Sequence, residues 1–247
     1  MSEEKSIKFV ETTPINYEGF TLIEGFPGMG LVGTIGAKYI SERLDFKEVG
    51  YIDANIFVPI IRIHNGVPVY PSRIYANEER KLAIIISEQI IPKFFVEKMA
   101  KAVVEWVREK KFKRLISLEG INAGDSEQKT VYGIGANDKS RKLVEEYGVK
   151  TINEGITTGI TSIILLGLKE SEMDAFSILG SVNMQADYKA AAALIKKLNE
   201  ILKLDIKIEP LLKEAKETEK ELIKQLEELK KTSESVQKFE ERTPMYT

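Results

Sequence analysis

The segment from Gly25 to Gly33 holds the residues whose spacing comes nearest to a known chemical motif. Its last six residues, GMGLVG, match the G-x-G-x-x-G pattern with which a strand-to-helix turn binds the pyrophosphate of a dinucleotide. An apolar run, FTLIEG, precedes the glycines, and a helix-like run, LVGTIGAKYISERL, follows them. Asp53 lies downstream, at the distance expected of the acid that binds the ribose. The spacing raises the hypothesis of a nucleotide-binding enzyme that uses Gly28–Gly33.

Three features of the surrounding sequence argue against this hypothesis. Phe26 and Pro27 separate the apolar run from the first glycine of the motif, whereas a nucleotide-binding turn starts where its strand ends. Pro27 also has no N–H to donate to a phosphate. After Asp53 the chain enters a hairpin-like region, not the next strand–helix unit of a doubly wound fold.

We therefore interpret the glycines as structural. Gly28 and Gly30 suit a tight turn between a strand and a helix. Further along, small residues would let that helix lie close to a sheet: Gly33, Gly36 and Ala37.

Other polar residues give little support to catalysis. The segment EGINAGDSE carries four polar side chains after a predicted buried strand, Glu119, Asn122, Asp125 and Glu127. Two carboxylates can do acid–base work, but no nucleophile or histidine accompanies them, so we predict a polar loop. We expect His64 to be an exposed hairpin residue, the hydroxyls of Thr157–Ser162 to cap a helix, and Trp106 to lie in the core. We predict no catalytic residue, no cofactor and no metal site.

The composition narrows the class of protein. The 247 residues are 43% hydrophobic and 30% charged, which suits a folded core under a highly charged surface. The 36 basic and 38 acidic residues give a net charge of −2, so we expect no nucleic-acid partner. The absence of cysteine and the single histidine exclude thiolate and multi-histidine metal sites. No apolar run reaches the ~18–20 residues of a membrane span, and MSEEKSIKF lacks the apolar part of a signal peptide. We expect a cytoplasmic protein with no membrane partner, and abundant Lys, Glu and Ile suit a thermophile.

The pattern of apolar residues predicts the elements that position these groups. Strands are expected near 20–24, 48–53, 56–63, 67–76, 81–87, 113–118, 129–134 and 173–180. Helices are expected near 30–44, 93–111, 139–147, 158–168 and 186–203. Asn65-Gly66 is a strong signal for a hairpin turn. Strands that partly form hairpins and partly alternate with helices predict a three-layer α/β/α sandwich around a mixed sheet.

The composition changes near Asp205. Pro210 suits the first turn of a new helix, and up to Arg242 apolar residues recur mostly every three or four positions among many Lys and Glu. We predict an α/β core over residues 1–205 and an extended amphipathic helix over residues 206–242. Its narrow apolar face, which includes Leu222, Leu226 and Leu229, suits a coiled coil or a partner surface. A charged helix in solvent is the alternative.

The chain closes on a short segment unlike the helix before it. Thr243-Pro244 ends helix formation. The last residues of the segment 243–247 are then Met245, Tyr246 and Thr247. A hydrophobic residue followed by tyrosine and a terminal carboxylate can be captured by a pocket that packs the apolar side chains and pairs the carboxylate with a lysine. We call residues 243–247 the docking tail.

Three segments, GFPGMGLVG, EGINAG and GITTGITSIILLGL, resemble the archaeal members of the proteasome assembly chaperone family, the homologues of eukaryotic proteasome assembly chaperones one and two. The resemblance spans roughly residues 15–205. It implies a three-layer α/β/α sandwich of the phosphorylase/hydrolase-like kind. It also implies that a hydrophobic-Tyr-X end, here Met245, Tyr246 and Thr247, docks between α subunits of the 20S proteasome.

The sequence therefore favours a non-enzymatic, ATP-independent chaperone or regulator of the proteasome. We expect a homo-oligomer, with a dimer or a dihedral tetramer favoured by symmetry, because several weak tails gain avidity together. Three alternatives stay open: an enzyme that binds nucleotide at Gly28–Gly33, a general holdase for unfolded client proteins, and a coiled-coil scaffold.

Overall fold

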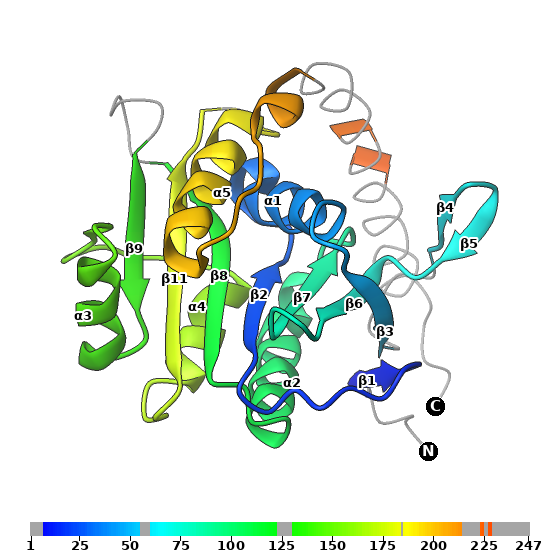
Figure 1. Ribbon diagram of the computed structural model, residues 1–247, viewed down its shortest axis with the longest axis horizontal. Helices are drawn as coiled ribbons and strands as arrows, with labels where there is room; N and C mark the ends of the chain where they lie inside the picture. The colour runs from blue at the N-terminus through cyan, green and yellow to red at the C-terminus, as the bar shows by residue number, and fades with distance from the viewer. Residues whose placement is uncertain are drawn as a thin grey trace, which may run out of the picture.

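The computed structural model describes residues 7–54, 60–122, 130–183, 185–213, 223–224 and 227–228. Its centre is a mixed sheet of nine strands between two layers of helices (Figure 1). The strands of this sheet are β1 (Ile7–Glu11), β2 (Thr21–Gly25), β3 (Lys47–Ala54), β6 (Ser72–Asn77), β7 (Leu82–Ser87), β8 (Arg114–Ile121), β9 (Val131–Gly135), β10 (Lys150–Thr151) and β11 (Asp174–Ser181). The predicted α/β sandwich with a mixed sheet is confirmed.

The strands lie in the order β1-β3-β6-β7-β2-β8-β11-β9-β10. The four central strands, β7, β2, β8 and β11, run parallel, whereas β1, β3 and β6 extend one side as an antiparallel meander and β9 pairs antiparallel with β11. The carboxyl ends of the parallel strands therefore meet at one end of the sheet, where loops of α/β folds commonly carry function.

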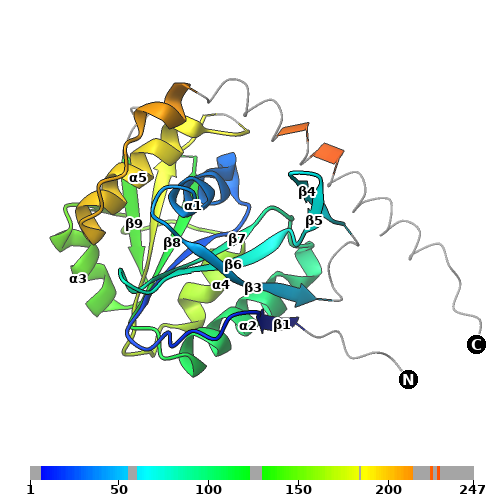
Figure 2. The same ribbon diagram turned by 45° about the vertical axis from the view of Figure 1, so that its right-hand side comes forward.

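Helices cover both faces of the sheet. α1 (Val32–Ser41) and α5 (Tyr188–Leu202) lie in front of it in Figure 1, and α2 (Val96–Glu109) and α4 (Ile160–Gly167) lie behind it. The view in Figure 2 separates the two layers. α3 (Asp138–Glu146) lies beside β9, and its Val144 joins the apolar cluster of the α1–α5 layer.

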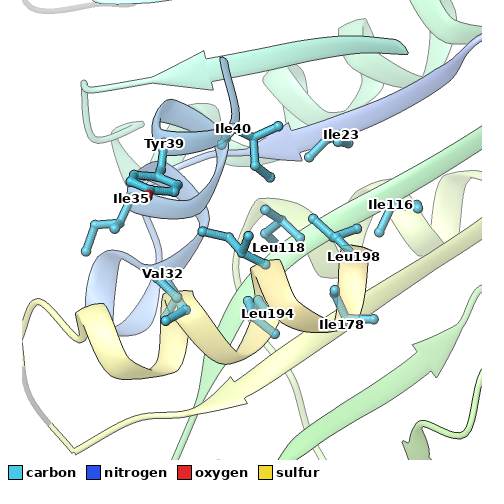
Figure 3. Close-up of a cluster of buried hydrophobic side chains, with 14 of the residues drawn as sticks. Ile23, Val32, Ile35, Tyr39, Ile40, Ile116, Leu118, Ile178, Leu194 and Leu198 are labelled. Carbon is cyan, nitrogen blue, oxygen red and sulfur yellow. The ribbon is translucent and has the colours of Figure 1, made fainter. Parts of the chain in front are cut away.

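The cluster between α1, α5 and the sheet explains the glycines of α1. Side chains from the helices and from three central strands interlock there (Figure 3). A Cβ at Gly33 would lie 2.4 Å from the carbonyl oxygen of Leu118, and one at Gly25 would lie 2.4 Å from the Cβ of Ala37. Because only glycine permits this approach, α1 lies directly on β2 and β8. The structural interpretation of these small residues is confirmed.

The opposite face holds an aromatic cluster. Trp106 of α2 is buried, stacks on Phe9 with ring centroids 4.7 Å apart, and meets Tyr17 edge-on at 5.3 Å. Trp106 is a core residue, as predicted. Phe9 belongs to β1, a strand that the sequence pattern did not predict. Its stacking on Trp106 helps to hold β1 at the edge of the sheet.

The Asn65-Gly66 hairpin is present as predicted, with φ angles of 50° and 78°. It joins β4 (Arg62–His64) to β5 (Val67–Val69), and these two strands form a separate sheet. The single long strand predicted over residues 67–76 is therefore wrong, because the chain leaves β5 and enters β6. Residues 55–59 of the strand predicted over residues 56–63 lie outside the described residues.

The described part of the chain continues its packing past Asp205. Residues 209–213 are helical, with Pro210 near the start. Ile206 and Leu211 are each 4% exposed and join the α1–α5 cluster, and the Tyr39 hydroxyl donates to the carbonyl oxygen of Lys207 over 2.6 Å. The predicted boundary at residue 205 is thus crossed by contacts, and its position stays a prediction. In the segments that the structure describes, we find no helix with the length and apolar character needed to span a membrane.

Candidate functional site

The glycine loop leaves the carboxyl end of β2 and crosses to α1 in a strained turn. Gly30 and Leu31 both adopt left-handed backbone conformations, with φ angles of 64° and 53°. Glycine adopts this region freely, whereas a leucine there is strained and must be held by its surroundings. Two backbone hydrogen bonds hold the turn: Leu31 N–H donates to Gly28 over 3.1 Å, and Asp187 N–H donates to Gly30 over 2.8 Å.

Two buried carboxylates lie beneath this loop. Glu24, the next-to-last residue of β2, accepts from the N–H of Phe26 over 2.9 Å. Glu119, near the end of the neighbouring strand β8, accepts with the same oxygen, Oε1, from Met29 N–H over 3.1 Å and from Gly120 N–H over 2.9 Å. Glu24 is fully buried and Glu119 is 8% exposed. The loop is therefore tied to the sheet by acids and not by apolar side chains alone.

The two carboxylates meet at one hydroxyl. Thr161 of α4 places its Oγ1 at 3.2 Å from Glu24 Oε2 and 3.4 Å from Glu119 Oε2. Burial raises the pKa of Glu24 above its ordinary value. Burial also raises the pKa of Glu119 to about 7, and the charge of Glu24 adds to this rise. Because two neighbouring buried carboxylates resist being charged together, the contact between them favours the protonated form of one member of the pair.

This arrangement bears on the dinucleotide hypothesis. Two N–H groups of the loop, those of Phe26 and Met29, already donate to the protein's own carboxylates. A Cβ at Gly28 would lie 2.0 Å from Glu119 Oε1, so the carboxylate fills the space against this glycine. A pyrophosphate entering the loop would compete with these carboxylates for the same donors and meet their negative charge.

Asp53, the proposed ribose acid, is not brought to the loop. It lies in β3, opposite Lys8 of β1, and β6 and β7 separate β3 from β2. The geometry thus argues against nucleotide binding in the manner of the G-x-G-x-x-G motif.

The sequence-based interpretation of Glu119 as part of a polar loop is wrong. Its side chain is buried because the fold brings it beside Glu24 and Thr161. Both of these residues come from elements that are distant in sequence. The hydroxyl-rich segment Thr157–Ser162 also differs from the prediction, since the residue that caps α4 is Gly159, with no capping bond from a side chain, and Thr161 serves the carboxylates instead. Asp125 and Glu127 lie outside the described residues.

Two surface cavities of the described part of the chain lie away from Glu24 and Glu119. Each has a volume of about 530 Å³, and one lies at the start of α3 and the other between the end of α2 and the start of β11. Neither is lined by the acid pair or the glycine loop. Over the described ranges, no group of three His, Cys, Asp or Glu residues is placed to hold a metal ion. The hydrogen bonds of Glu24, Glu119 and Thr161 join the glycine loop to the sheet and to α4.

The remaining predicted site residues are placed as follows. His64 is exposed at the hairpin, as expected, with its Nε2 3.4 Å from the side-chain amide of Asn65. The predicted docking and helix-face residues lie outside the described residues: Leu222, Leu226, Leu229, Met245, Tyr246 and Thr247. Glu24 and Thr161 were missed as partners of Glu119. A signal for Glu24 exists, because it is the one charged residue in the apolar run FTLIEG.

Comparison with known proteins identifies relatives over nearly the whole chain. The model of the PAC2 family matches residues 22–226. An uncharacterised protein of Methanocaldococcus jannaschii, MJ0106, is 34% identical over 243 residues, which cover 98% of each chain. The crystal structure of Pyrococcus furiosus PbaA, described as an archaeal homologue of proteasome-assembly chaperone, superposes with a TM-score of 0.83 and 30% identity over 92% of this chain and 100% of that one. P. furiosus PbaB, described as an archaeal proteasome activator, superposes with a TM-score of 0.72 and 24% identity over 90% of this chain and 99% of that one.

Proposed function

This chain belongs to the PAC2 family, and from that membership we propose that it is an ATP-independent assembly chaperone or regulator of the 20S proteasome. The predicted resemblance to archaeal proteasome assembly chaperones is confirmed by the family match and by the likeness to PbaA. The observation that carries the proposal is this likeness, because it extends over 92% of the chain at 30% identity. The likeness to PbaB, at 24% identity, supports the fold alone.

The contact with the proteasome is assigned to the docking tail. Met245 would fill an apolar hole between two α subunits, Tyr246 would pack its ring and donate from its hydroxyl, and the carboxylate of Thr247 would pair with a lysine. A single tripeptide offers little contact area, so one tail alone binds weakly. Several tails on one oligomer would gain avidity through a high effective concentration.

The amphipathic segment over residues 206–242 would carry each tail away from the body. Its apolar face, Leu222, Leu226 and Leu229, is a second candidate contact, either with the α ring or with an unfolded client protein. A cytoplasmic location belongs to this proposal, as does a dimer or dihedral tetramer.

A non-enzymatic role agrees with the geometry of the glycine loop. Two donors of the loop, the N–H groups of Phe26 and Met29, are engaged by Glu24 and Glu119, and these acids face a threonine hydroxyl within the body. Such a loop is suited to shaping a rigid surface. These observations support a binding protein, and the proposal includes no cofactor and no nucleic-acid or membrane partner.

A pull-down tests the proposal. The full chain, immobilised through an N-terminal tag, is exposed to recombinant α subunits and to assembled 20S particles. We expect both to be retained by the wild type, and retention to fall when Tyr246→Ala is used. Thr247→Ser is the matched control, because it keeps the carboxylate and the chain length, and it should retain both. If neither α subunits nor 20S particles bind the wild type, the proposal is wrong.

A further inference from the structure

α1 is buried on nearly every side. A helix at the surface of a protein commonly keeps a polar face toward solvent, yet eight of the ten residues of α1 are buried, and only Lys38 and Ser41 are partly exposed. The sheet and α5 cover part of this helix (Figure 3). The chain after α5 adds to the cover, because Tyr39 donates to the carbonyl oxygen of Lys207 and Leu211 joins the same cluster. The segment after α5 therefore takes part in the packing of α1.

Ile223 extends this packing further along the chain. It follows residues 214–222, which lie outside the described residues, and it is partly buried against the α1–α5 cluster. Residues 223–224 and 227–228 are helical, and they are the orange pieces above and to the right of α1 in Figures 1 and 2. Contact between the C-terminal segment and the body thus reaches at least to Ile223.

The exposed side chains of this segment show which side of its helix faces solvent. Lys224, Glu227 and Glu228 are exposed. Successive residues of an α-helix are rotated by about 100°, so these three side chains lie within an arc of about 100°. Ile223 lies at the edge of this arc, in agreement with its partial burial. On the helix predicted for this segment, three leucines fall on the side opposite the exposed residues, and we call them the leucine face: Leu222, Leu226 and Leu229.

A described leucine has the same orientation. Residues 209–213 are helical, and within them Leu211 is 4% exposed, whereas Leu212 is 43% exposed. On one continuous helix, Leu211 and Leu229 would lie about five turns apart and therefore on the same side. The side that is buried at Leu211 is thus the side that carries the leucine face.

We propose that the leucine face is docked on the body of its own chain, beside Ile223 on the α1–α5 layer, so that the arm that presents the docking tail begins after Leu229. A second copy of the chain and an unfolded client are the other candidate occupants of the leucine face. The chain's own body is favoured because Ile223 already contacts it. A surface tethered to its binding site also has a high effective concentration, which favours contact within one chain.

Docking of the leucine face limits what the segment can bind. Contact of this face with the α ring or with a client would require its release from the body. Docking by the tail does not require this release, because the tail lies beyond Leu229 in the sequence. The leucine face and the tail are therefore independent of each other and can be tested separately.

Hydrogen exchange of backbone amides on the full chain tests the docking. An isolated helix of this length is marginal in water, so slow exchange of residues 223–229 reports contact with the body. Replacing all three residues of the leucine face by alanine keeps the helix propensity and removes the apolar contact, so protection should fall roughly tenfold or more. The matched control replaces three exposed residues by alanine and should keep the protection: Lys224, Glu227 and Glu228.

The amides of α5 report whether the core is intact in each variant. Where the triple leucine variant loses their protection, Leu226→Ala alone repeats the comparison. Protection of the wild type should stay constant over a roughly hundredfold range of protein concentration, because contact within one chain is independent of mass action.

Three results would overturn the proposal. Protection that rises with protein concentration would assign the leucine face to a second copy. Unprotected amides in the wild type would leave this face open to a client, and equal losses in the two triple variants would mean that the leucines do not hold the segment. The measurement uses no proteasome, so a tail that fails to bind 20S particles would contradict the proposed function and leave this inference standing.

Discussion

Glu24 and Glu119, from two neighbouring parallel strands, converge on the hydroxyl of Thr161 at 3.2 Å and 3.4 Å. Their other oxygens accept backbone N–H groups from either side of Pro27. The acid pair thereby joins three parts of the fold: the central sheet, the glycine loop and the start of α4. The G-x-G-x-x-G segment takes part in this junction through Gly28, which leaves room for the Glu119 carboxylate, and through the N–H of Met29.

The acid pair predicts a pH dependence of stability. The folded chain holds the Glu119 proton up to a pKa of about 7, whereas an ordinary glutamate releases it near 4.5. Between these values the folded state binds more protons than the unfolded state, so the free energy of unfolding falls as pH rises through this window. The raised pKa of Glu24 acts in the same direction. We expect a loss of up to roughly 3 kcal/mol between pH 4.5 and 7.

Urea unfolding of wild type and Glu119→Gln at pH 5 and pH 8 measures this effect. The amide keeps an acceptor for Met29 and Gly120 but cannot ionise, so the variant should lose much of the pH dependence and be the more stable protein at pH 8. Glu154→Gln, at an exposed residue, is the control and should follow the wild type. If wild type and Glu119→Gln show the same pH profile, the carboxylates do not share a proton as described.

The close approach of α1 to β8 predicts that alanine has unequal effects on stability at two glycines of this helix. In an exposed helix interior, Gly→Ala stabilises by about 1 kcal/mol. At Gly33 the new Cβ would meet a backbone carbonyl at 2.4 Å, which cannot move without shifting a strand, so we expect a loss of roughly 3 kcal/mol. At Gly36 the nearest atom, at 3.2 Å, is the end of the Leu118 side chain, which can adjust.

Gly36→Ala is therefore the matched control and should change the free energy of unfolding by less than about 1 kcal/mol. Chemical denaturation of Gly33→Ala and Gly36→Ala measures the two changes in the free energy of unfolding. Equal effects at the two positions would mean that α1 does not lie as close to β8 as the structure has it.

Much of the fold could be predicted from the sequence, because it depends on local signals. Asn65-Gly66 specifies a hairpin by its backbone preference alone, and the apolar periodicity of residues 96–109 and 188–202 marks two helices that bury one face each. β1 escaped prediction because its position depends on a contact between Phe9 and Trp106, which are far apart in sequence.

The candidate site was less predictable for the same reason. Whether Glu119 is a solvated loop residue or a buried acid depends on Glu24 and Thr161, which only the assembled sheet brings to it. The spacing between the glycine loop and Asp53 was also misleading, because separation along the chain does not tell which strands become neighbours in the sheet. Burial of a carboxylate depends on tertiary contacts. The one sequence signal for it is Glu24, the charged residue inside the apolar run FTLIEG.

Nucleotides should not stabilise the protein. The N–H groups of Phe26 and Met29 already donate to Glu24 and Glu119, so NAD(H), ATP and AMP at millimolar concentration should leave the melting temperature unchanged. A ligand at one hundred times its Kd would add about 2.7 kcal/mol, which is a readily measured shift. A clear rise of the melting temperature with wild type, lost in Gly30→Asp, would instead favour the nucleotide-binding enzyme.

The boundary of the core can be located by truncation. A chain ending at residue 213 keeps Ile206 and Leu211, both buried against the α1–α5 cluster, whereas a chain ending at Asp205 loses them. Full burial of two such side chains contributes roughly 3–6 kcal/mol, so the shorter chain should melt at a distinctly lower temperature. Equal melting temperatures of the two truncated chains would place the boundary at residue 205, as the sequence predicts.

The most direct measurement of the central claim is surface plasmon resonance on immobilised 20S proteasome. Hot-spot energetics predict that Tyr246→Ala costs about 2 kcal/mol per engaged tail, a roughly thirtyfold loss of affinity that grows when several tails bind together. One residue added after Thr247 should do similar damage, because it displaces the carboxylate from its partner. Thr247→Ser should bind like the wild type, and melting temperature should not change in any of the three variants. Undiminished binding by both Tyr246→Ala and the extended chain would contradict docking by the tail and direct attention to Leu222, Leu226 and Leu229.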